Sequence, residues 1–102
     1  MMGGTLDALI VALCRDFERR RLAIENGSFG KRTLMEYRYI NFKMLDAAAE
    51  IVGVSQAESF ILEIGERRGY AKCENHYMSE VTYKRCKAEI KRNIAVKLYL
   101  TE

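Results

Sequence analysis

The chain has 102 residues, of which 49% are hydrophobic and 30% charged, and its formal net charge is +3. This length fits a single domain over residues 1–102, and this balance of apolar and charged residues excludes general disorder. No uncharged apolar run approaches the roughly 20 residues that cross a bilayer, and the N-terminal charges follow the apolar residues, unlike in a signal peptide. We therefore expect a cytoplasmic protein without a membrane partner.

The absence of proline and of strictly alternating runs favours an all-α fold. A first helix is expected from Thr5, as N-cap, to the stop signal at Asn26-Gly27. Its apolar stripe recurs at helical spacing and consists of Leu6, Leu9, Ile10, Leu13, Phe17 and Ile24. The run Arg19-Arg20-Arg21 points in several directions around this helix, so we expect it to be solvated.

The stretch from Thr33 to Val52 is predicted to be the central helix. Thr33 and Glu36 form a T-x-x-E capping box, and Gly53 follows the last apolar residue. One apolar face recurs every three or four positions, at Tyr37, Ile40, Met44, Ala48 and Ile51. The acids Asp46 and Glu50 lie on the polar side, where they are expected to be solvated.

A second apolar patch lies on the opposite side of this helix and consists of Met35, Tyr39 and Phe42. One interpretation is that the third or fourth helix covers the patch within the monomer. The other is a homodimer in which two central helices meet about a two-fold axis. Either way, the patch is a candidate interface.

A third helix is predicted over residues 56–68, after an S-x-x-E capping box at Ser55 and Glu58. Its apolar face holds Ala57, Phe60, Ile61 and Ile64. Gly65 lies inside this helix and indicates a close contact with another helix, and Gly69 is expected to end it. Residues 70–78 are consistent with a helix of two turns or with an irregular connection.

A last helix is predicted from Ser79, a good N-cap, to about Leu100. Its buried stripe consists of Tyr83, Cys86, Ile90, Ile94 and Leu98. Beside that stripe lies an arc of basic residues, Lys84, Arg85, Lys87, Lys91 and Arg92. The whole net positive charge of the chain falls in residues 69–102, which hold seven Lys/Arg and four Asp/Glu.

The opening of this helix, YMSEVTYKR at residues 77–85, carries a hydrophobic-Ser-x-x-Thr-hydrophobic motif before a lysine-rich segment. It resembles the turn and recognition helix of sigma-factor region 4-like helix-turn-helix proteins, and the C-terminal part of ArpU-like phage transcriptional regulators. The resemblance implies a small regulator of phage or mobile-element origin that binds double-stranded DNA. The residues that would set, anchor and charge the recognition helix are Ser79, Thr82, Tyr83, Lys84, Arg85, Lys87, Lys91 and Arg92.

The basic helix and the function of the chain each have a second interpretation. The lysine-rich face of this helix is also typical of a solvated surface on a bundle helix. The alternative function is a helical protein–protein interaction module or homodimer with no nucleic-acid role, which would use Met35, Tyr39 and Phe42.

Nothing in the sequence predicts an enzyme, a cofactor, a metal site or a small-molecule substrate. The three cysteines, Cys14, Cys73 and Cys86, lack a disulfide-framework spacing and are expected to be reduced thiols. Cys73-x-x-His76 with Cys86 lacks the fourth ligand of a structural zinc site. We expect a bundle of four main helices, or five if residues 70–78 are helical, with a helix-turn-helix-like C-terminal half.

Overall fold

The computed structural model describes residues 3–72 and 78–100, and it confirms the predicted all-α bundle. The helices are α1 (Gly4–Arg15), α2 (Phe17–Asn26), α3 (Lys31–Val52), α4 (Val54–Glu66) and α5 (Glu80–Lys97), with a 3₁₀ turn, η1, at Tyr70–Lys72. The predicted first helix is therefore two helices, because the chain bends at Asp16, whose φ of −91° and ψ of 4° leave the helical region.

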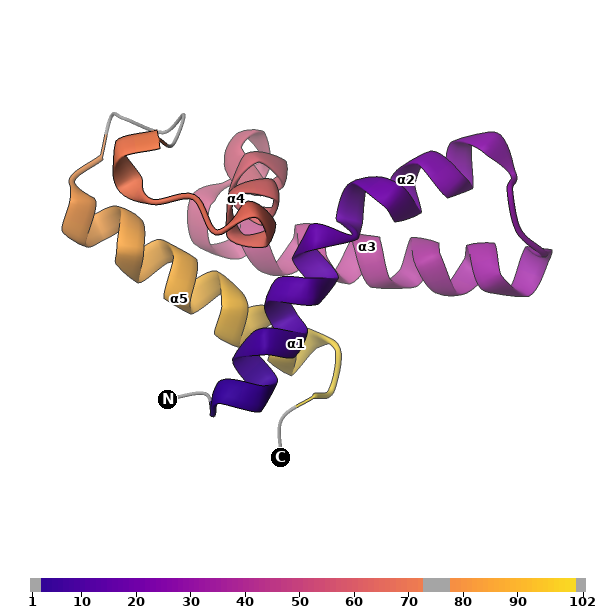
Figure 1. Ribbon diagram of the computed structural model, residues 1–102, viewed down its shortest axis with the longest axis horizontal. Helices are drawn as coiled ribbons and strands as arrows, with labels where there is room; N and C mark the ends of the chain where they lie inside the picture. Colours follow the sequence, from indigo (N-terminus) through magenta and orange to yellow (C-terminus); the bar gives the residue numbers. More distant parts are fainter. Residues whose placement is uncertain (1–2, 73–77, 101–102) are drawn as a thin grey trace.

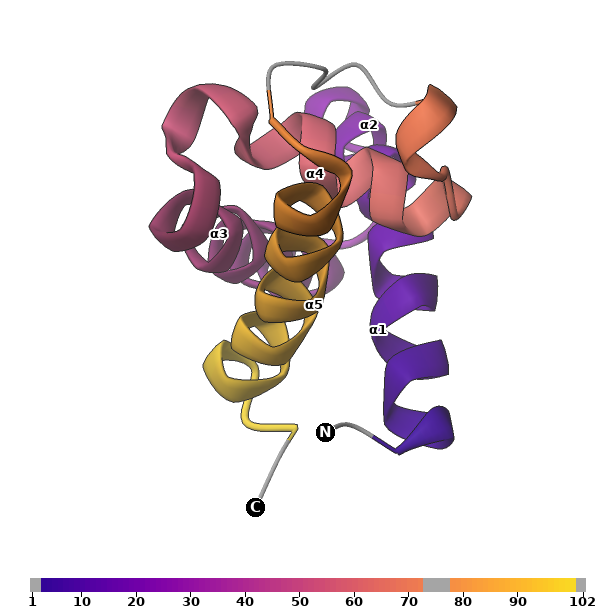
Figure 2. The ribbon, with the colours of Figure 1, turned by 90° about the vertical axis from the view of Figure 1, so that its left-hand side faces the viewer.

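The long helix α3 organises the bundle, as the sequence predicts (Figure 1). Helix α2 returns antiparallel along the N-terminal half of α3, and α4 and α5 pack against α3 as well. Helix α1 lies against α4 and α5, and Figure 2 shows α1 and α5 running side by side with α4 across one end of the pair. The apolar residues of α1, α3, α4 and α5 meet in one core.

Three predicted helix starts are wrong because glycine takes the N-cap position instead. Helices α1, α3 and α4 begin after Gly3, Gly30 and Gly53, and none of these caps has a side-chain hydrogen bond. Each helix begins one or two residues before the expected Thr5, Thr33 or Ser55 cap. Gly3 and Gly30 have extended φ values of −69° and −62° that any residue adopts, whereas the φ of +88° at Gly53 favours glycine.

The helix ends follow their signals in part. Gly53 stops α3 as predicted, with a φ of +88° that disfavours other residues. Helix α4, however, ends at Glu66, short of the predicted Gly69, because Arg67 takes the left-handed conformation at a φ of +57°. The Arg68 N–H then donates to the Glu63 carbonyl at 3.0 Å and closes the last turn.

The prediction that Arg20 is solvated is wrong, because its side chain is only 5% exposed. The bend at Asp16 turns α2 so that Arg20 points towards α3. Its Nε donates to Asn41 Oδ1 at 2.6 Å, and its Nη2 donates to the Leu13 carbonyl at 2.6 Å and to Met44 Sδ at 3.2 Å. Burial lowers the pKa of the guanidinium.

Gly65 marks a close helix contact, as predicted. A Cβ atom at this position would lie 2.6 Å from the Arg15 amide nitrogen and 2.7 Å from the Cys14 carbonyl carbon. The absence of a side chain therefore lets the backbones of α1 and α4 touch.

Cys14 and Cys86 are buried free thiols, as expected, and burial raises the pKa of the Cys14 thiol to about 12.

We predict that Arg20→Met destabilises the fold by about 2–4 kcal/mol, because it leaves the Asn41 side chain and the Leu13 carbonyl without their buried donor. Urea unfolding followed by circular dichroism measures the change. The matched control is Arg19→Met, since the Arg19 side chain is 80% exposed, and we expect its effect to stay within about 0.5 kcal/mol. Equal stabilities of the two variants would contradict the role of Arg20.

Candidate functional site

The start of α5 has the predicted cap. Ser79 Oγ accepts a hydrogen bond from the Thr82 N–H at 3.1 Å and lies 3.0 Å from Thr82 Oγ1. Both residues are outside the core, whereas Tyr83 is fully buried and donates its hydroxyl hydrogen to Glu63 Oε1 at 2.6 Å. Tyr83 therefore anchors α5 to α4 from the inside and contributes no surface.

Two cations of the basic arc are turned towards the protein. Lys87 Nζ donates to the Arg68 carbonyl at 2.6 Å and lies 5.1 Å from the centre of the Tyr83 ring. Lys91 Nζ forms an ion pair with Asp7 of α1 at 2.8 Å. Both are only partly exposed, so their positive charge chiefly links α5 to its neighbours.

The other three cations of the arc, Lys84, Arg85 and Arg92, are exposed. Lys84 pairs with Glu80 at 2.8 Å, and Arg85 lies 3.9 Å from Glu89, both pairs within α5 at a spacing of four residues. Surface pairs of this kind are weak and are broken readily by a stronger anion. The exposed basic surface is thus narrower than the sequence arc predicts.

The segment that would precede a recognition helix lies between α4 and α5. In it, residues 70–72 form the 3₁₀ turn η1, and the Tyr70 hydroxyl donates to the Met78 carbonyl at 2.6 Å. Tyr77, Cys73 and His76 lie outside the described residues. Within residues 3–72 and 78–100, no three His, Cys, Asp or Glu side chains gather as metal ligands, and no helix could span a membrane.

The second apolar patch of α3 is exposed. Met35 is 58% exposed, Tyr39 48% and Phe42 65%, and we call these three residues the α3 apolar face. The expectation that another helix covers it is wrong. Helix α2 packs on a different side of α3, through Arg20 and Asn41, and α5 packs on the C-terminal half, where Asn93 Nδ2 donates to the Ala47 carbonyl at 2.9 Å.

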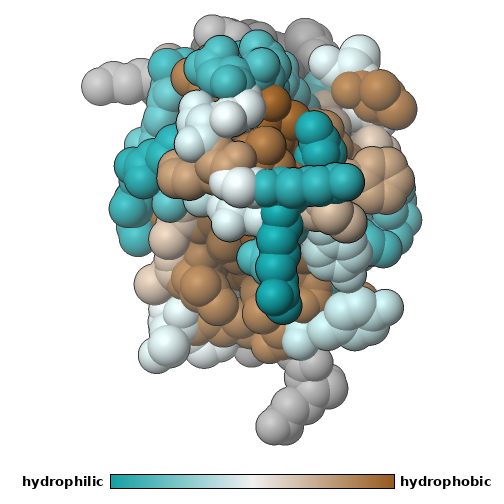
Figure 3. Space-filling model, turned by 90° about the vertical axis from the view of Figure 1, so that its right-hand side faces the viewer, coloured by the Kyte–Doolittle hydropathy of each residue, from teal (hydrophilic) through white to brown (hydrophobic). Residues whose placement is uncertain are grey.

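A hollow of about 280 Å³ adjoins this face between α3 and the start of α4. It is lined by Phe42, Leu45, Asp46, Ala49, Val54 and Ala57. Val54 is 86% exposed, so the apolar surface continues from α3 onto α4. Figure 3 looks onto the end of the molecule where the α2–α3 hairpin lies and shows further apolar surface gathered in the lower half of that view.

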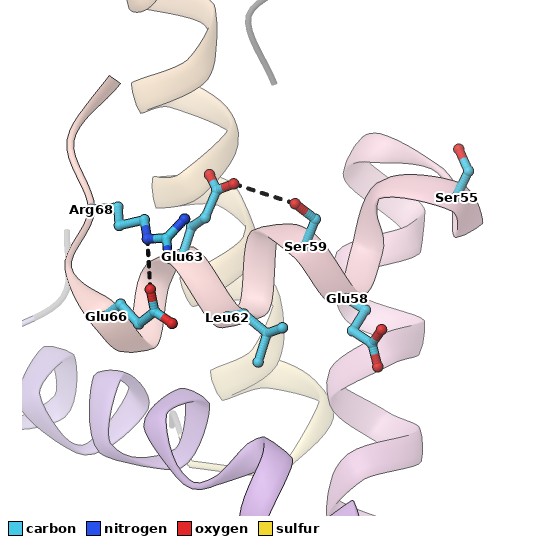
Figure 4. Close-up of a pocket in the computed structure, with 7 residues that line it drawn as sticks. All are labelled: Ser55, Glu58, Ser59, Leu62, Glu63, Glu66 and Arg68. Carbon is cyan, nitrogen blue, oxygen red and sulfur yellow. Dashed lines mark hydrogen bonds and ion pairs between the residues drawn. The ribbon is translucent and has the colours of Figure 1, made fainter. Parts of the chain in front are cut away.

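A second hollow, of about 300 Å³, lies along α4 (Figure 4). Its lining is mostly polar and includes three acids: Ser55, Glu58, Ser59, Leu62, Glu63, Glu66 and Arg68. The buried Glu63 accepts from Tyr83 and, at 3.3 Å, from Ser59, while Arg68 pairs with Glu66 at 2.6 Å. Because Glu63 binds Tyr83, this cluster of polar side chains joins α4 to the start of α5. No sequence pattern reveals this hollow, since Glu63 is one acid among the 14 acidic residues of the chain.

Asp46 and Glu50 have side chains that are 44% and 49% exposed, as expected of solvated charges, but both are also paired with α5. Lys97 of α5 forms ion pairs with both carboxylates, at 2.9 Å from Asp46, and Asn93 donates to Glu50 at 3.0 Å. The hydrogen bonds that Lys97 and Asn93 donate to Glu50 lower the pKa of that carboxyl group, and the bonds that Lys97 donates to Glu50 and Asp46 raise the pKa of the Lys97 ammonium. The contacts join residues 43 to 51 positions apart, so no local pattern reveals them.

No protein-family model, curated protein or solved structure matches this chain.

We predict that Glu50→Gln removes an acid-sensitive part of the stability. Because the folded pKa of Glu50 is lowered, its contribution is fully present above its ordinary pKa of 4.5 and is lost as the pH falls through the lower folded value. Unfolding at several pH values should show the wild type more stable near neutrality and the two proteins converging in acid. A stability difference that stays constant down to acid pH would contradict the linkage. The control, Glu36→Gln, removes an exposed acid of the same helix that lies 3.8 Å from Arg32 and contacts neither Lys97 nor Asn93, so its effect should be small at every pH.

Proposed function

We propose that the chain is a helical protein–protein interaction module that binds its partner through the α3 apolar face. The observation that carries this proposal is the joint exposure of Met35, Tyr39 and Phe42 on one side of a single helix. Aromatic side chains present about 150–250 Å² each, so these exposed fractions amount to roughly 300 Å² of largely apolar surface. The largest apolar patch on a typical monomer covers about 300–600 Å² and is often functional.

The surroundings of the face support binding to a protein. Helix α3 is a rigid platform, since Arg20 and Asn41 fix it to α2 and Asn93 fixes it to α5. A rigid platform loses little conformational freedom when it binds, which favours affinity. The adjoining hollow offers a partner side chain an apolar depression beside Phe42.

Site-specific photo-crosslinking tests this proposal. A photoreactive phenylalanine analogue at position 42 should yield an adduct of discrete mass in cells that produce the protein. The same analogue at position 36, an exposed residue of α3 off the apolar face, should yield far less. Equal or absent adducts at the two positions would contradict an interface at the α3 apolar face.

A second candidate function, a DNA-binding transcriptional regulator, is favoured by the start of α5. Ser79 caps an accessible helix N-terminus, and Lys84, Arg85 and Arg92 are exposed on the same helix. Such an arrangement suits a helix that enters the major groove and neutralises phosphates. The resemblance to ArpU-like phage regulators supports the same candidate.

A salt titration of duplex binding tests this second candidate. Neutralisation of three phosphates by Lys84, Arg85 and Arg92 predicts a log–log slope of affinity against salt of about −2.7. Alanine at all three positions should abolish binding, whereas alanine at the exposed Arg15, Arg19 and Arg32 removes the same charge and should preserve most of it. Absence of binding at low salt, or equal losses in the two triple variants, would exclude α5 as the DNA-binding element.

A further inference from the structure

We infer that the partner of the α3 apolar face is a second copy of this chain, bound with the two α3 helices antiparallel and position 42 opposite itself. This inference rests on the proposed function and specifies its occupant. Four features of α3 point to this arrangement: a seven-residue apolar repeat, the hollow beside it, a pair of complementary charges and the failure of the neighbouring register.

The apolar repeat runs along one line of α3. Met35, Phe42 and Ala49 are spaced seven residues apart, the spacing at which side chains return to one side of a helix that packs along another. In an antiparallel pair centred on Phe42, the residue seven positions before the centre faces the residue seven positions after it. Met35 of each copy therefore faces Ala49 of the other, and Tyr39 faces Leu45.

The antiparallel register centred on Phe42 places a side chain of the second copy over the hollow between α3 and α4. Ala49 lines the hollow together with Leu45, Val54 and Ala57. Met35 of the second copy would enter it, and a flexible, unbranched thioether suits an irregular apolar depression. The two-fold axis repeats this contact, so Met35 of each copy enters the hollow of the other copy.

The charges beside the apolar repeat match in the same register. Arg38 lies four residues before Phe42, and Asp46 lies four residues after it, so each Arg38 faces Asp46 of the second copy. Arg38 is exposed and forms no ion pair within the described part of the chain. Asp46 keeps its contact with Lys97 and still has an exposed edge at the rim of the hollow.

A shifted register lacks these matches. A slide of three residues would place Arg38 opposite Lys43 of the second copy and Met35 opposite Asp46, which sets like charges together and an apolar side chain against a carboxylate. The proposed dimer interface is also small. Stable interfaces bury about 800 Å² on each partner, whereas the α3 apolar face supplies roughly 300 Å². We therefore expect a reversible monomer–dimer equilibrium.

Cysteine cross-linking tests the register. In a chain that carries Cys73→Ser, with Cys14 and Cys86 buried, Phe42→Cys should form an intermolecular disulfide under mild oxidation. Met35→Cys is the matched control, because it is similarly exposed but would lie about 20 Å from its own copy along antiparallel helices, too far for a disulfide. Equal cross-linking at the two positions, or cross-linking at 35 alone, overturns the register.

Sedimentation at increasing concentration tests the dimer itself without altering the centre of the interface. Arg38→Glu places one acid against Asp46 of each copy and should raise the dimer Kd by roughly tenfold, whereas Arg32→Glu, an exposed change on the same helix, should leave it within about twofold. A similar Kd for the two variants overturns the charge pairing.

A wild-type protein that stays monomeric at every concentration overturns the inferred second copy. Photo-crosslinking at position 42 then tests whether the proposed interaction module stands without the inferred dimer. An adduct with a different protein supports the interaction module and excludes self-association. The absence of any adduct overturns both proposals.

Discussion

The structure depends on one buried guanidinium. An arginine stays charged at any physiological pH, so taking Arg20 out of water is costly unless its donors are satisfied. The acceptors it finds are neutral: the Asn41 amide oxygen, the Leu13 carbonyl and the Met44 sulfur. Asn41 in turn donates to the Phe17 carbonyl at 3.2 Å. This network binds the bend between α1 and α2 to the middle of α3, and it thereby decides which side of α3 is covered.

A second set of contacts fixes α4 and α5 and uses much of the positive charge of the chain. The Tyr83–Glu63 hydrogen bond joins α5 to α4 from within, and the Gly65 contact brings α4 against the backbone of α1. Lys91 and Lys97 then pair with acids of α1 and α3. Part of the excess of lysine and arginine in the last third of the sequence is therefore paired with acids of the protein itself. The positive charge that remains for an external anion is smaller than the sequence suggests.

The sequence predicts the parts of this fold that depend on short-range signals. The Ser79 cap, the buried stripe of α5 and the tight contact at Gly65 all follow from a single residue type or from helical spacing. The bend at Asp16 has no such signal, because neither proline nor glycine occurs there. The burial of Arg20 depends on a partner 21 residues away, and nothing in the run of three arginines distinguishes the middle one. The Thr33 and Ser55 capping boxes are not used, because α3 and α4 begin one or two residues before them, after glycines, which also serve as N-caps.

The same contacts explain why the α3 apolar face is left uncovered. Arg20 and Asn41 hold α2 on one side of α3, and Lys97 and Asn93 hold α5 on another, so neither helix can rotate onto Met35, Tyr39 and Phe42 without losing buried hydrogen bonds or ion pairs. The fold itself gains little from large apolar side chains at positions that are about half exposed or more. Polar residues there would serve a monomer equally well and would lower its tendency to associate. Apolar residues at these positions make physical sense when a further surface covers them. For that reason we propose this face as the binding surface in preference to the partly neutralised face of α5.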